Sequence, residues 1–133
     1  MHGPPAAQPN EPPLVLIADD ARDNREMYAG YLSENGFRVA EARDGAEAVR
    51  LAKQIRPAVV MLDLEMPRMD GFAVTLRIRR DANICNTPIL VLTADDSRER
   101  AALKAGANVV CIKPCIPAAL VPHIQRLPRQ SVE

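Results

Sequence analysis

The chain has 133 residues, of which 47% are hydrophobic and 26% charged, as is typical of a single globular domain with a buried core. Its 17 basic residues balance 17 acidic ones, and it has no Trp, two Tyr and two Phe, so we expect no nucleic-acid partner. Three cysteines without a CxxC pair favour a reducing compartment. Because no apolar run is long enough to span a membrane and no secretory signal pattern is present, we expect a cytoplasmic protein with no membrane partner.

Composition divides the chain into three predicted segments. Residues 1–13 hold five of the 12 prolines and almost no large apolar residue, so they cannot bury enough surface to offset their ordering entropy. They are predicted to form a disordered, Pro-rich tail. Residues 14–127 are predicted to form the folded domain, and 128–133 a short C-terminal tail.

Short apolar runs alternate with helical patterns along the predicted domain. In chain order, strands are expected at 14–18, 37–40, 58–62, 88–92 and 109–112. Helices are expected around 27–32, between Asp44 and Pro57, and at 72–80, 97–105 and 117–127. Asp44 and Glu47 have the spacing of a capping box, whereas Pro122 is expected to kink or shorten the last helix. This alternation predicts βαβ units and an α/β fold, with a parallel sheet covered by helices on both faces.

Polar residues follow four of the five apolar runs. Asp19 and Asp20 follow the first run, Asp63 the third, Thr93 the fourth and Lys113 the fifth. Because ligands of open parallel sheets bind at the carboxyl ends of the strands, we expect these side chains to gather at one edge. Three close carboxylates repel one another unless a cation compensates, and oxygen ligands suit Mg²⁺. With a lysine, a hydroxyl and an aspartate that can become an acyl phosphate, the pattern predicts Mg²⁺-dependent phosphoryl transfer.

These residues resemble the motifs of a known family. The similar segments are Asp19-Asp20, the loop 63–71, Thr93-Ala94 and Lys113-Pro114. Together they resemble the receiver domain of two-component response regulators, over about residues 14–127. The resemblance implies a flavodoxin-like (βα)5 fold with strand order 2-1-3-4-5. It also implies that the chain is a phosphorylation-controlled binding module rather than an enzyme, and that Asp63 receives a phosphoryl group from a histidine kinase or a phosphotransfer protein.

The resemblance assigns a metal role to four positions. It implies that Asp20 and Asp63 bind Mg²⁺ through their side chains and that Glu65 does so through its backbone carbonyl. Asp19 is implied to act mainly through a bound water.

The resemblance also implies which residues contact the phosphoryl group. Thr93 and Lys113 are expected to do so, and the small Ala94 leaves the group accessible. The Lys113-Pro114 bond is expected to be cis, as is typical of the family. Val110 stands where the family often has an aromatic residue that follows phosphorylation, so we expect only a modest population shift.

Several interpretations of the whole chain remain open from the sequence. The protein is expected to be a single-domain response regulator that signals to an unknown protein through its 95–120 face. A receiver excised from a hybrid kinase or a larger regulator has the same motifs, and a pseudo-receiver that never carries phosphate shares the fold. A phosphohydrolase of the haloacid dehalogenase type also uses a strand-end Asp, Mg²⁺, a Thr and a Lys, but its nucleophile opens a DxD motif after the first strand, where this chain has adjacent aspartates.

Overall fold

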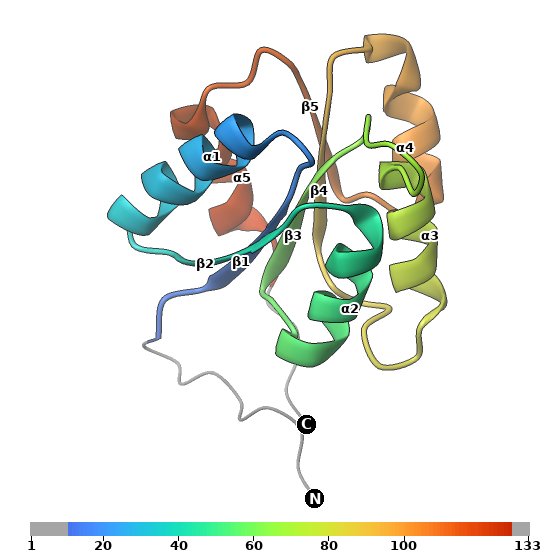
Figure 1. Ribbon diagram of the computed structural model, residues 1–133, viewed down its shortest axis with the longest axis horizontal. Coiled ribbons are helices and arrows are strands. Elements are labelled where there is room, and N and C mark those ends of the chain that lie inside the picture. Colours follow the sequence, from blue (N-terminus) through green and yellow to red (C-terminus); the bar gives the residue numbers. More distant parts are fainter. Residues whose placement is uncertain (1–10, 129–133) are drawn as a thin grey trace, which may run out of the picture.

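The structure, a computed structural model, describes residues 11–128. In this part of the chain, strands and helices alternate as the apolar runs predict (Figure 1). The elements are β1 (Leu14–Ala18), α1 (Arg22–Glu34), β2 (Arg38–Ala42), α2 (Gly45–Ile55), β3 (Val59–Asp63), α3 (Gly71–Arg80), β4 (Ile89–Thr93), the 3₁₀ helix η1 (Asp96–Arg98), α4 (Glu99–Ala105), β5 (Val109–Ile112) and α5 (Pro117–Arg126). The predicted tails, 1–13 and 128–133, lie almost entirely outside the described residues.

The sheet is parallel throughout and its strand order is β2-β1-β3-β4-β5, so the predicted flavodoxin-like fold is confirmed. Helices α1 and α5 cover one face, and α2, α3 and α4 cover the other (Figure 1). Alternate residues of each central strand enter opposite cores, because side chains of a strand point to alternating faces. Leu16 and Val60 pack beneath α2 and α3, whereas Ile17 and Met61 pack against Tyr28 and its neighbours from α1 and α5.

Local sequence explains where the helices begin. The Asp44 side chain accepts a hydrogen bond from the Glu47 amide at 2.8 Å, which confirms the N-terminal cap of α2. The Glu47 carboxylate reaches one residue further back than a standard capping box, to the amide of Arg43. Asp70 caps α3 in the same way by accepting from the Ala73 amide. Side-chain caps therefore fix the starts of α2 and α3.

Two predicted helices differ from the structure in detail. The segment 97–105 divides into η1 and α4, because the Asp95 side chain caps a tight first turn at Ser97. The last helix is neither ended nor shortened by Pro122 and runs for ten residues. Leu120 and Ile124 are buried on either side of that proline, and their packing holds the helix together across the missing hydrogen bond.

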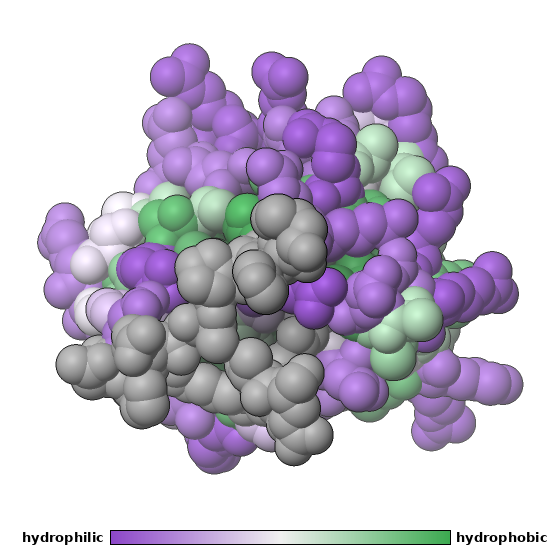
Figure 2. Space-filling model, turned by 90° about the horizontal axis from the view of Figure 1, so that it is seen from below, coloured by the Kyte–Doolittle hydropathy of each residue, from purple (hydrophilic) through white to green (hydrophobic). Residues whose placement is uncertain are grey.

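Arg79 from α3 fastens the amino-terminal edge of the sheet. Its guanidinium donates to the carbonyls of Cys85, Thr87 and Gly106 and to the side chain of Asn108, at 2.6–3.0 Å. These contacts join the loop before β4 to the loop before β5. Figure 2 views the molecule from this side, and the visible periphery there is mostly hydrophilic.

No helix within the described residues is long and apolar enough to cross a membrane.

Candidate functional site

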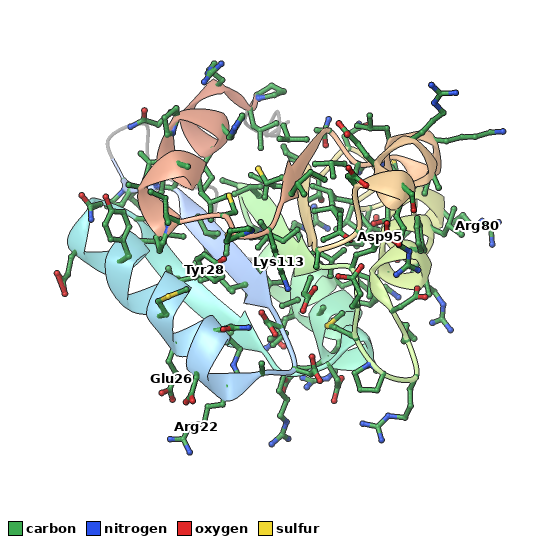
Figure 3. All side chains as sticks on the ribbon, turned by 90° about the horizontal axis from the view of Figure 1, so that it is seen from above. Arg22, Glu26, Tyr28, Arg80, Asp95 and Lys113 are labelled. Carbon is green, nitrogen blue, oxygen red and sulfur yellow. The ribbon has the colours of Figure 1, made fainter. Side chains whose placement is uncertain are left out.

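Strand register brings the predicted site residues together at the carboxyl edge of the sheet. Ala18 pairs with Leu62 between β1 and β3, so the residues that follow them, Asp19 and Asp63, are neighbours. Thr93 pairs with Ile112 between β4 and β5, and Lys113 therefore extends one residue beyond Thr93. Figure 3 looks onto this edge from above, with Lys113 near its middle. The prediction that the polar strand ends meet is confirmed in geometry.

Three carboxylates form an acidic cluster at this edge. Asp19, Asp20 and Asp63 each offer an oxygen within 4.8 Å of the others. Asp19 is only 2% exposed and Asp63 only 5%, whereas Asp20 is exposed. Backbone amides hold the buried pair in place, because the Ala21 amide donates to Asp19 Oδ1 at 2.8 Å and the Glu65 amide to Asp63 Oδ1 at 3.2 Å.

The pKa values of both buried carboxyl groups are raised, because the nearby cations do not fully offset the effect of burial. Burial raises the pKa of Asp19, and the nearby Asp20 carboxylate raises it further. Burial also raises the pKa of Asp63, although the Lys113 ammonium partly opposes this shift. Asp19 Oδ2 is buried without a hydrogen-bond partner in residues 11–128. An unpartnered carboxylate oxygen within an acidic cluster is what a hard divalent cation such as Mg²⁺ would satisfy, so the donor set fits that ion.

Lys113 contacts the predicted phosphoacceptor directly. Its ammonium donates to Asp63 Oδ1 at 3.1 Å, and the Asp63 side chain in this pair is almost fully buried. The Lys113–Pro114 peptide bond is cis, as expected. Two residues further on, the Cys115 carbonyl accepts from the Tyr28 hydroxyl at 2.9 Å, which ties the loop after β5 to α1. Two hydrogen bonds therefore hold this loop, one from Lys113 to Asp63 and one from Tyr28 to Cys115.

Thr93 takes a different orientation from the one the phosphoryl-binding prediction suggests. Its side chain is fully buried, and its hydroxyl donates to Glu65 Oε2 at 2.6 Å. The same hydroxyl oxygen accepts from the Asp95 amide at 3.1 Å. The other oxygen of the Glu65 carboxylate accepts from the Ala94 amide at 3.2 Å. The structure thus pairs Thr93 with the Glu65 carboxylate and not with the Asp63–Lys113 pair.

Arg98 is a residue of this edge that the strand-end pattern did not predict. Its guanidinium donates to Glu65 Oε2 at 3.1 Å and lies over the Phe72 ring, 4.8 Å from the centroid. Arg98 follows no strand, and no motif in the sequence relates it to Glu65, 33 residues earlier. Only the fold, which sets the loop after β3 beside the loop after β4, brings the two together.

Comparison with known proteins identifies the family. The family model described as "Response regulator receiver domain" matches residues 15–125, and the chain therefore belongs to the receiver family of two-component systems. Receiver domains are signalling domains and not classical enzymes. The match supports the resemblance over the haloacid dehalogenase alternative.

Curated relatives include regulators that are longer than this chain. "Transcriptional regulatory protein PrrA" of Mycobacterium tuberculosis is 39% identical over 120 residues, which cover 89% of this chain and 51% of the relative. "Response regulator MprA" of Mycobacterium sp. (strain KMS) is 42% identical over 122 residues, covering 90% and 52%. The chain thus spans about half the length of the curated relatives it matches. Since one of these is named a transcriptional regulator, the expectation of no nucleic-acid partner gains no support.

Solved structures of receivers have the same fold. The chemotaxis protein CheY4 of Vibrio cholerae superposes with a TM-score of 0.82 at 32% identity, covering 88% of this chain and 99% of that one. The receiver domain of the sensor histidine kinase PA1611 of Pseudomonas aeruginosa gives a TM-score of 0.81 at 31% identity, covering 87% and 97%. That structure has a magnesium ion coordinated in its active site cleft.

Proposed function

We propose that Asp63 accepts a phosphoryl group from a phosphohistidine of a histidine kinase or a phosphotransfer protein. The observation that carries this proposal is the buried Asp63 carboxylate, with Lys113 on one oxygen and two further carboxylates within 4.8 Å. The Asp63 oxygen attacks phosphorus, an O–P bond forms, and the N–P bond to the donor imidazole breaks. The product is an acyl phosphate on Asp63.

The other edge residues have distinct proposed roles. Asp20 and Asp63 bind Mg²⁺ through their side chains, Glu65 binds it through its backbone carbonyl, and Asp19 acts through a water. When bound, Mg²⁺ supplies charge neutralisation for the transferring phosphoryl oxygens. Lys113 neutralises a second oxygen as a point charge, and Thr93 donates its hydroxyl to a third.

The proposed output is a change in protein binding at the 95–120 face. This face includes exposed apolar side chains from α4, β5 and the loop before α5, namely Leu103, Ile112 and Ile116. Exposed apolar side chains such as these are available for contact with a protein partner. Val110 is smaller than the aromatic residue that the family often has at this position, so we expect only a modest population shift. The coupling free energy between phosphorylation and partner binding should be about 1–3 kcal/mol.

We propose further that the protein acts in the cytoplasm, either as a single-domain response regulator or as the receiver part of a larger regulator or hybrid kinase. These arrangements use the same phosphoacceptor chemistry and differ in what is attached to the receiver. Its partner in either arrangement is a histidine kinase or a phosphotransfer protein.

Labelling with a small phosphodonor tests the proposal. With radiolabelled acetyl phosphate and Mg²⁺, the protein should become labelled, and Asp63→Asn should not, because an amide is no nucleophile. Asp96→Asn, which changes the charge equally at an exposed position of η1, should label as the original protein does. Full labelling of Asp63→Asn would refute the assignment.

A second experiment addresses the metal. Titration with Mg²⁺, followed by NMR, should show weaker binding in Asp20→Ala than in Asp19→Ala, because Asp20 is proposed to bind the ion directly. Unchanged affinity in Asp20→Ala would contradict this role.

A further inference from the structure

We propose that the Glu65 carboxylate is a positioning group that competes with the phosphoryl group for the Thr93 hydroxyl and the Ala94 amide. This inference rests on the proposed function of Asp63. It concerns the Glu65 side chain, whereas the metal role proposed above uses only the Glu65 backbone carbonyl.

The geometry shows a carboxylate held by three donors. Glu65 Oε2 accepts from the Thr93 hydroxyl at 2.6 Å and from the Arg98 guanidinium at 3.1 Å. Glu65 Oε1 accepts from the Ala94 amide at 3.2 Å. An anion with three equatorial oxygens, such as a phosphoryl group, would use the same kinds of donor. The carboxylate therefore occupies part of a binding site suited to an anion.

Each of the two donors at the end of β4, the Thr93 hydroxyl and the Ala94 amide, has one proton to give. The Thr93 hydroxyl has a single O–H, and while it donates to Glu65 it cannot donate to a phosphoryl oxygen on Asp63. The hydroxyl oxygen also accepts from the Asp95 amide at 3.1 Å, through one of its two lone pairs. The Ala94 amide likewise has a single N–H. Binding by the phosphoryl group and binding by Glu65 are thus mutually exclusive at both donors.

Arg98 keeps the carboxylate in this position. Its guanidinium donates to Glu65 while it stacks on the Phe72 ring of α3, so its direction is fixed from two sides. A phosphoryl group on Asp63 would repel the Glu65 carboxylate and take over its donors. Release of Glu65 would then remove the hydrogen bond that links Arg98, at the end of η1, to the loop 63–71. Phosphorylation would in this way reach the 95–120 face without an aromatic residue at position 110.

Beryllofluoride, a phosphoryl mimic, provides a test that separates this inference from the metal site. Binding at Asp63 would be measured by NMR at saturating Mg²⁺ for the original protein, Glu65→Ala and Glu65→Gln. Glu99→Gln removes one negative charge at an exposed position of α4 and serves as the matched control. Mg²⁺ affinity would be measured separately, without beryllofluoride, and the Ala94 amide shift would be recorded in the metal-free proteins.

Loss of the competing carboxylate should favour the mimic. We expect beryllofluoride affinity to rise about three- to tenfold in Glu65→Ala and less in Glu65→Gln, whose amide oxygen can still accept from Thr93. Glu99→Gln should stay within about twofold, and Mg²⁺ affinity in Glu65→Ala within about threefold. The Ala94 amide proton should move upfield in metal-free Glu65→Ala, because it loses its acceptor.

Two results would overturn the inference while leaving the proposed function intact. The first is unchanged or weaker beryllofluoride binding in Glu65→Ala when the original protein binds the mimic. The second is a loss of Mg²⁺ affinity of about tenfold or more in that variant, which would make the side chain a metal ligand. Absence of beryllofluoride binding at Asp63 in the original protein would instead refute the proposed function itself.

Discussion

Replacing Gly71 by alanine should destabilise the domain and disturb the phosphoacceptor. Gly71 is the first residue of α3 and packs directly against the end of β3. A Cβ at this position would lie 2.7 Å from Leu64 Cα and 2.9 Å from the Asp63 carbonyl oxygen. Both are backbone atoms that cannot rotate away, so the strand end or the helix must shift.

The size of the effect follows from two opposing contributions. Overpacking of a close contact costs about 1–3 kcal/mol, whereas replacing glycine by alanine within a helix stabilises by about 0.5–1 kcal/mol. We therefore expect Gly71→Ala to lower the free energy of unfolding by about 1–2 kcal/mol. Gly30→Ala in α1 is the matched control: a Cβ there would meet no atom within 4 Å, so this variant should be more stable by about 0.5–1 kcal/mol.

Urea denaturation measures the change in the free energy of unfolding, which should be negative for Gly71→Ala and positive for Gly30→Ala. The rate of labelling by acetyl phosphate measures the effect on the site. A shift at Asp63 of a few tenths of an ångström should slow labelling of Gly71→Ala severalfold, because in-line attack depends on orientation. Gly30→Ala should label at the original rate. If Gly71→Ala were as stable as Gly30→Ala, or were labelled as fast, the inference that close packing of α3 against the end of β3 positions Asp63 would be refuted.

Two further predictions concern stability. Arg79→Ala should lower the free energy of unfolding by about 2–4 kcal/mol, because it removes five charge-assisted hydrogen bonds to four residues. The Arg80 side chain points away from the protein (Figure 3), so Arg80→Ala should change the free energy of unfolding by less than about 0.5 kcal/mol. Equal losses of stability in the two variants on chemical denaturation would contradict this prediction. Burial raises the pKa of Asp19 above its ordinary value of 3.8, so the metal-free domain should lose stability as the pH rises from 3.8 through the pKa of the folded state. Without Mg²⁺, Asp19→Asn should therefore melt at a higher temperature than the original protein at neutral pH, and this difference should shrink toward pH 4. If Asp19→Asn were less stable than the original protein at pH 7 without Mg²⁺, burial of the Asp19 charge would not be destabilising.

The sheet and most of the site could be predicted because they depend on local patterns. An apolar run that ends in a polar residue marks both a buried strand and the point where that strand meets the ligand edge. This is why Asp19, Asp63, Thr93 and Lys113 were assigned to one edge, and why the register then brought them together. The Asp44 cap was predicted for a similar reason, since its acceptor and donor lie three residues apart.

What the sequence did not reveal depends on contacts between distant segments. The Glu65 side chain and Arg98 are 33 residues apart, and nothing in the local pattern of either indicates that they meet. Thr93 was expected to face the phosphoryl position, but a hydroxyl can rotate to whichever acceptor is closest, and in this protein that acceptor is Glu65. Pro122 is expected to kink or shorten α5, yet the helix runs for ten residues, with Leu120 and Ile124 buried on either side of the proline.

Chemical location of the phosphoryl group would test directly whether Asp63 is the phosphoacceptor. After reaction with acetyl phosphate and Mg²⁺, borohydride reduces an acyl phosphate on aspartate to homoserine, and mass spectrometry of the digested protein identifies the altered position. We expect homoserine at residue 63 and unmodified aspartate at 19 and 20. Homoserine at 19 or 20, or no homoserine in a protein that carries label, would contradict the claim that Asp63 is the phosphoacceptor.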